Sequence, residues 1–228
     1  MASTTHSPIF ILGSAPNYVI PDESPRAIYT ANRAVELVPK ASGHASEVCH
    51  VTSVVGSKEV RKPEIVEALT ENTPDRLVVR GDANLEDLFS RDVLESMDVV
   101  KLDEKGLEFQ RRYLTDWQLA RSSFDSARKL VSPKKWRNAV FKFGRGGVQG
   151  VSTGLFAALF AADEHPQAPI VLIGITFLGG EHFYGTGQMS QQRAFADRYL
   201  LPKLPPSIQN RLFTTDPHTA STMAMPIY

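Results

Sequence analysis

Hydroxyl and glycine residues stand together in the run VSTG (Val151–Gly154), directly before an apolar stretch with the length of a short helix. Hydroxyls and N–H groups at a helix N-terminus can bind a carboxylate or a phosphate, although Ser152 or Thr153 can also simply cap the helix. Four glycines in the preceding GRGGVQG cost conformational entropy, which favours a binding role. Ser152, Thr153 and Gly154 are therefore candidate ligand contacts.

A single histidine, His182, follows the apolar run Ile170–Phe177 and lies in the glycine-flanked stretch EHFYG. An isolated histidine is more often structural than catalytic, but loops after buried strands often carry catalytic side chains. Imidazole titrates near neutral pH, so His182 is the candidate general base, and Tyr184 can donate to a leaving phosphate. The other histidines lack the spacing of metal ligands, so no metal site is predicted.

Two further turns follow apolar runs near the N-terminus. In GSAPN (Gly13–Asn17), the glycine lets a ligand approach the backbone and small residues keep the turn open. Ser14 and Asn17 can donate to phosphate or sugar hydroxyls, and Asn32 either contacts a ligand or caps the helix that follows. The chain has neither G-x-G-x-x-G nor G-x-x-x-x-G-K-[ST], which disfavours dinucleotide and P-loop sites.

These residues need a scaffold that brings the ends of several strands together. Apolar, β-branched runs alternate with helical patterns, which indicates an α/β fold: a Rossmann-like, mostly parallel sheet with helices on both faces. Ligands of such sheets bind beyond the carboxyl ends of the strands. The expected strands are Ile9–Leu12, Ala27–Thr30, Val48–Val55 and Ile170–Ile175, with weaker signals at Arg76–Val79, Val99–Leu102 and Leu212–Thr214. The expected helices are Glu59–Glu71, Leu85–Ser96, Leu107–Arg121, Thr153–Ala162 and Ser190–Leu201.

We expect one domain over residues 1–228, with residues 103–147 as a helical insertion or lid. Basic and aromatic residues interleave in that segment. They form either a solvated basic face or a flap that holds an anionic ligand or a membrane-bound acceptor.

Composition narrows the class of protein. Lys plus Arg and Asp plus Glu both number 25, and this zero net charge disfavours a nucleic-acid binder. One cysteine, Cys49, excludes an internal disulfide and is expected to be a buried strand thiol rather than a nucleophile. The N-terminus lacks the features of a signal peptide, and no run has the length of a membrane span, so we expect a cytoplasmic protein.

Taken in order, these motifs resemble the sialyltransferase superfamily, in particular the small bacterial lipooligosaccharide sialyltransferases that use CMP-sugars. That family begins with a strand and G-N-G-P-S, where this chain has Gly13-Ser14-Ala15-Pro16-Asn17, and its second strand ends in C-N, where this chain has Ala31-Asn32. Its S-T-G turn, apolar helix and strand ending in G-[IF]-x-F are similar to Ser152-Thr153-Gly154, LFAALFAAD and Gly174–Phe177. Its H-Y-Y or S-H-Y element is similar to His182-Phe183-Tyr184.

The resemblance implies an inverting glycosyltransferase that moves a carboxylated ketose, sialic acid or Kdo, from a CMP-sugar to a glycan or glycolipid acceptor. The turn at Ser152–Gly154 would hold the donor, and His182 would deprotonate the acceptor hydroxyl as CMP departs. No metal or other cofactor is required for this departure. An acceptor carried on a membrane lipid would place the protein at the inner face of the membrane, where the basic and aromatic residues of 103–147 would contact it.

Two alternatives stay open. A pyrophosphokinase-like enzyme could bind a pterin or nucleotide diphosphate on the same sheet, but it would need Mg²⁺ and carboxylate ligands, which are sparse near the glycine turns. A non-catalytic CMP-sugar-binding protein would keep the VSTG turn without needing His182.

Overall fold

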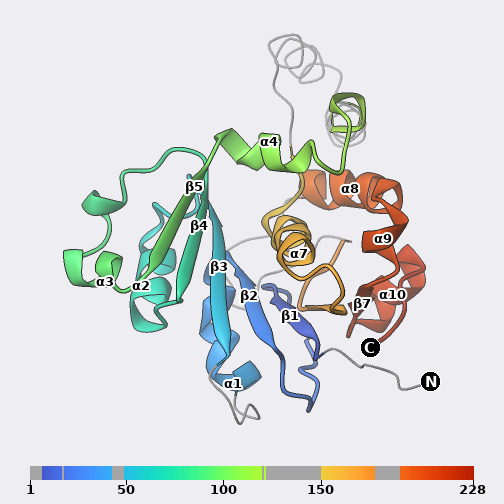
Figure 1. The fold of residues 1–228 in the computed structure, drawn as a ribbon, viewed down its shortest axis with the longest axis horizontal. Helices are drawn as coiled ribbons and strands as arrows, with labels where there is room; N and C mark the ends of the chain where they lie inside the picture. The colour runs from blue at the N-terminus through green and yellow to red at the C-terminus, as the bar shows by residue number, and fades with distance from the viewer. Residues whose placement is uncertain (1–6, 17, 43–48, 120, 122–149, 178–190) are drawn as a thin grey trace.

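The computed structural model describes residues 7–16, 18–42, 49–119, 121, 150–177 and 191–228 (Figure 1). Within these ranges seven strands form one sheet in the order β5-β4-β3-β2-β1-β6-β7, and every neighbouring pair is parallel. The predicted α/β class with a Rossmann-like parallel sheet is confirmed. The strands are β1 (Ile9–Leu12), β2 (Ala27–Ala31), β3 (His50–Gly56), β4 (Arg76–Arg80), β5 (Asp98–Leu102), β6 (Ile170–Ile173) and β7 (Leu212–Thr214).

Most of the predicted helices are shorter or more interrupted in the structure, whereas the one predicted over Thr153–Ala162 extends to Glu164. Among those in the described ranges, none combines the length and the apolar character needed to cross a bilayer. The 3-10 helices are η1 (Asn32–Leu37), η2 (Leu85–Asp87), η3 (Glu104–Gly106) and η4 (Leu201–Lys203). The α-helices are α1 (Val38–Ser42), α2 (Pro63–Glu71), α3 (Arg91–Glu95), α4 (Leu107–Gln110), α7 (Thr153–Glu164), α8 (Gln191–Leu200), α9 (Pro206–Gln209) and α10 (Pro217–Met223).

Local chemistry explains where the predicted helices break. The helix expected over 107–121 ends after α4, because Thr115 and Gln118 exchange side-chain-to-backbone hydrogen bonds of 2.8 and 3.2 Å that start a new turn. The helix expected over 85–96 breaks at Ser90, whose extended backbone precedes α3. The helix expected from Glu59 begins only at Pro63, which occupies its first turn.

Strand boundaries also move at two places. The strand expected to reach Ile175 ends at Ile173, because Gly174 has a φ of +64° that turns the chain out of the sheet. The strand expected from Val48 begins at His50, so Cys49 precedes it and is half-buried rather than a buried strand thiol. Burial first, and then the charge of Asp75, raise the pKa of Cys49 to about 11, so its sulfur stays protonated at neutral pH.

Alternating strand residues pack against helices on opposite faces of the sheet. On one face Ile9, Ile11 and Leu172 join a core with Leu155 and Phe156 of α7. On the other face, Phe10 and Leu12 pack against η1 and α1, while β4 packs against α2. β1 and β6 are fully buried, which confirms that both strands lie in the interior.

The connections change direction at β1. From β1 the chain moves outward through β2, β3, β4 and β5, and it then returns through α7 to β6 on the other side of β1. In Figure 1, α4 runs across the edge where β4 and β5 end, toward α7. The carboxyl ends of β1 and β6 therefore form a topological switch point, where ligands of open α/β sheets bind.

Candidate ligand site at the carboxyl ends of the strands

The turns after β1 and β6 are bonded to each other at the switch point. The Gly13 N–H donates to the Ile173 carbonyl at 2.7 Å, and the Ala15 N–H donates to the Gly174 carbonyl at 2.8 Å. A Cβ at position 13 would lie 2.4 Å from the Gly174 oxygen, so only glycine fits there. Ser14 is half-buried and Pro16 is exposed. Four of the five residues predicted in GSAPN therefore lie at this edge, and Asn17 is outside the described residues.

Gly154, in the first turn of α7, lies at the same edge. A Cβ on it would come within 3.3 Å of the Ile175 side chain, and that side chain would lie 2.5 Å from a Cβ on Gly13. The two glycines, 141 positions apart in the chain, thus contact one residue beyond β6. From Gly154 the chain runs along α7 to the opposite edge of the sheet, and the parallel strand β6 then returns it to Ile175 at the edge where α7 begins.

Two buried oxygens of predicted site residues have no hydrogen-bond partner within the structure described here. They are Oδ1 of Asn32, directly after β2, and Oγ1 of Thr153, the first residue of α7. Asn32 also has a φ of +55°, and the Thr153 residue is only 3% exposed. Buried polar atoms are normally paired, so each of these two oxygens calls for a partner, such as a bound water or a ligand.

Ser152 has a different role from Thr153. Its side chain accepts a hydrogen bond of 3.2 Å from the Leu155 N–H, so it is the N-cap of α7. Its own N–H donates to Asp197 of α8 at 2.9 Å. The capping interpretation is therefore correct for Ser152, and among the three predicted residues of this turn the unpaired hydroxyl belongs to Thr153.

Sequence reasoning missed three buried polar residues behind this turn: Arg80, Gln110 and Asp197, which are 7%, 0% and 2% exposed. A partnered, buried Arg80 could have been predicted from the sequence. The run RLVVR places two arginines on one face of a strand that is otherwise apolar, and a buried cation requires partners. Asp197 had no such signal, because the burial of the helix face that carries it is known only from the structure. For Gln110 we find no sequence signal.

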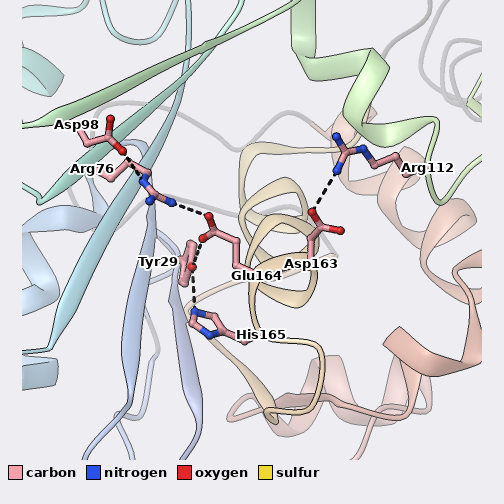
Figure 2. Close-up of polar contacts among 7 residues, drawn as sticks. All are labelled: Tyr29, Arg76, Asp98, Arg112, Asp163, Glu164 and His165. Carbon is pink, nitrogen blue, oxygen red and sulfur yellow. Dashed lines mark hydrogen bonds and ion pairs between the residues drawn. The ribbon is translucent and has the colours of Figure 1, made fainter.

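A second polar cluster lies at the opposite end of α7 (Figure 2). The Tyr29 hydroxyl donates to Glu164, and the same hydroxyl lies 3.1 Å from Nε2 of His165. The Arg76 guanidinium lies between two carboxylates, with Glu164 at 2.5 Å and Asp98 at 2.9 Å. Burial and the Glu164 contact raise the pKa of Tyr29, so its phenol stays protonated.

The neighbouring carboxylate at this end of α7 has the same kind of partners. Asp163 accepts from the Tyr113 hydroxyl at 2.5 Å and from Arg112 at 3.2 Å. Arg211 donates to three backbone carbonyls around the end of α7, those of Ala162, His165 and Ala168, at 2.7 to 3.1 Å. Two acidic side chains at a helix C-terminus are unfavourable for the helix dipole, and these cations compensate them. We interpret this end of α7 as a structural anchor.

The predicted catalytic residues, His182 and Tyr184, lie outside the described residues, as does most of the predicted insertion 103–147. Over the ranges that are described, no group of three or more His, Cys, Asp or Glu side chains is arranged to hold a metal ion. No protein-family model matches the chain, and neither a curated protein nor a solved structure matches it significantly.

Proposed function

We propose that the protein is an inverting glycosyltransferase that uses a CMP-linked carboxylated ketose as donor and a glycan or glycolipid as acceptor. The donor binds at the carboxyl ends of β1, β2 and β6, against the first turn of α7. His182 is the general base, and Tyr184 donates to the departing phosphate.

The observation that carries this proposal is the meeting of the β1 turn and the α7 turn at Ile175, with two unpaired buried oxygens at the same edge. The glycines let a ligand approach the backbone, and the N–H groups of the first turn of a twelve-residue helix favour an anion. Asn32 and Thr153 supply acceptors for hydroxyl or amino groups of the donor. A nucleotide-linked acidic sugar offers all of these groups together.

The transfer step follows from the donor. The acceptor hydroxyl oxygen bonds to the anomeric carbon from the face opposite the phosphate, and its proton passes to His182. The bond between that carbon and the phosphate oxygen breaks, and CMP leaves with the electron pair. Because attack and departure are on opposite faces, the anomeric configuration inverts.

Turnover of CMP-sialic acid and CMP-Kdo with a glycan acceptor is the direct test, with release of CMP as the readout. General-base removal costs about 10²–10⁴-fold in rate, so His182→Ala should lose turnover by that factor. CMP affinity should change little in the variant, because the base contacts the acceptor. The rate of the parent should fall below a pH of about 6–7, where imidazole becomes protonated.

A thermal-shift comparison of CMP, CDP, UDP, GDP and NAD tests the nucleotide separately. A ligand that binds only the folded state raises the unfolding temperature, so CMP should give the largest shift. A larger shift with another nucleotide would contradict the donor assignment. If His182→Ala binds CMP and keeps full turnover, only the role of His182 as general base is contradicted. If the parent binds CMP but turns over neither donor, a non-catalytic binding protein is favoured.

A further inference from the structure

Three buried polar side chains from three different elements hold the backbone just before α7. Arg80 ends β4, Gln110 ends α4, and Asp197 lies on α8. They act on two consecutive residues, Val151 and Ser152. Side chains of this kind are seldom so deeply buried unless their partners are fixed.

Both backbone groups of Val151 are bonded. Its carbonyl accepts from Nη2 of Arg80 at 2.9 Å, and its N–H donates to Oε1 of Gln110 at 2.8 Å. The next N–H, that of Ser152, donates to Asp197 at 2.9 Å. Consecutive peptide groups are therefore fixed immediately before Thr153, the residue with the unpaired hydroxyl.

Two of these side chains, Arg80 and Gln110, also hold a strained turn between β5 and α4. The Lys105 carbonyl accepts from Nε and Nη2 of Arg80 at 3.0 and 2.9 Å, and from Nε2 of Gln110 at 2.8 Å. Lys105 has a φ of +64°, a left-handed conformation that a non-glycine residue adopts at an energetic cost when its surroundings impose it. Strain held by such a dense set of bonds is typical of functional sites.

Packing leaves the arrangement little freedom. A Cβ on Gly150 would come within 2.6 Å of the Gln110 amide, and one on Gly106 within 2.6 Å of the Phe156 ring. The Arg80 guanidinium lies 4.3 Å from the centre of that ring. The first residues of α7 cannot shift without breaking several of these contacts.

We infer that Arg80, Gln110 and Asp197 are positioning residues, which hold the turn before α7 in the orientation that presents Thr153 and the helix N-terminus to the ligand. The inference rests on the proposed function for the identity of that ligand. Well-packed apolar groups often stabilise a fold as well as a buried ionic group does. Polar groups instead fix the directions of peptide bonds, and a site that must match a ligand needs those directions.

Arg76 offers a matched control within the same strand. It lies on the same face of β4 and also contacts α7, but at the carboxyl end through Glu164. Arg76→Met and Arg80→Met each remove one guanidinium that holds one end of one helix. A purely structural role would make the two variants alike except in stability.

Two readouts separate the roles at a temperature where both variants are folded. The first is amide hydrogen exchange over residues 150–155 and 160–168, followed by mass spectrometry. Arg80→Met should speed exchange at 150–155 by about tenfold or more, and Arg76→Met should do so only at 160–168. The second is calorimetric titration with CMP, whose affinity should fall about tenfold or more in Arg80→Met and less than about twofold in Arg76→Met.

Unchanged exchange at 150–155 in Arg80→Met would overturn the inference, as would faster exchange with unchanged CMP affinity. If Arg80→Met speeds exchange only at 150–155 but the parent protein binds no CMP, the proposed function is overturned and the positioning role stands. Should Arg80→Met fail to fold, Asp197→Ala and Asp197→Asn make the same test. The asparagine oxygen can still accept from the Ser152 N–H, so Asp197→Asn should restore slow exchange and CMP affinity, and Asp197→Ala should not.

Discussion

Arg76 and Arg80 stand on the same face of β4 and bond to opposite ends of α7. Arg76 reaches the Glu164 carboxylate, and Arg80 reaches the Val151 carbonyl. Four residues of strand span about 13 Å, whereas twelve residues of helix span about 18 Å, and two long side chains cover the difference. The helix that begins at the candidate site is thus tied to the sheet at both ends, and the two ends can be perturbed independently.

The anchor at the carboxyl end depends on Tyr29, whose buried hydroxyl donates to Glu164. Tyr29→Phe removes that donor inside the core, so the free energy of unfolding should fall by about 1–3 kcal/mol. Tyr228→Phe is the control, because its hydroxyl bonds Glu23 at the surface, where the loss should be under about 1 kcal/mol. Denaturant unfolding of both variants measures the difference, and equal losses would contradict the anchoring role.

His165, beside Tyr29, should make stability depend on pH. Burial first, and then the charges of Arg26, His50 and Arg211, lower the pKa of His165, and Glu164 opposes them. The unfolded chain therefore takes up the proton near pH 6.5, while the folded chain takes it up only at lower pH. The contribution of neutral His165 is full above about pH 6.5 and is lost as the pH falls through the folded pKa.

The corresponding variant is His165→Gln, which removes the titrating group and keeps a donor. Its free energy of unfolding should fall less steeply than that of the parent between about pH 7 and pH 5. Urea denaturation at a series of pH values gives both slopes. An equally steep fall in the variant would show that His165 does not titrate abnormally.

The two glycines that meet Ile175 should respond differently to a methyl group. Gly13→Ala forces a Cβ to within 2.4 Å of a backbone oxygen, which cannot move aside easily. Overpacking of this kind costs about 1–3 kcal/mol. Gly154→Ala meets only the Ile175 side chain, at 3.3 Å, and should change the unfolding free energy by less than about 1 kcal/mol. Thermal melts of both variants test the difference, and a tolerated Gly13→Ala would contradict the close approach of the β1 and β6 turns.

Much of the sheet was predictable because its strands are apolar and β-branched throughout. Ile9–Leu12 and Leu212–Thr214 have the predicted limits, and β6 differs only where Gly174 turns the chain. Helices were predicted less well, because their limits depend on local bonds such as those of Thr115 and Gln118, which compete with apolar periodicity.

The candidate site was only partly predictable. Turns after two strands pointed to Gly13 and Asn32, because the carboxyl ends of parallel strands share one edge. The hydroxyl residues at the start of a predicted helix pointed to Thr153. The side chains behind the turn were not found, because Arg80 and Asp197 come from β4 and α8, and only the fold brings them together. Likewise, the sequence could not separate the cap Ser152 from the unpaired Thr153.

Thr153→Val separates ligand binding from folding more directly than any other substitution. The Thr153 hydroxyl is buried and has no partner in the described structure, so its replacement by a methyl group should leave the free energy of unfolding unchanged or raise it. Ser152→Ala, at the position directly before Thr153, is the matched control. It removes a helix cap and should lower stability by about 1 kcal/mol.

Calorimetric titration of CMP into the parent and Thr153→Val, at one temperature and salt concentration, is the decisive measurement. If the hydroxyl bonds the ligand, the valine variant should bind CMP more weakly by about 1–3 kcal/mol, or roughly 5- to 150-fold, without loss of stability. Equal affinity in the two proteins would return Thr153 to an ordinary helix position, and a parent that binds no CMP would contradict the proposed donor site altogether.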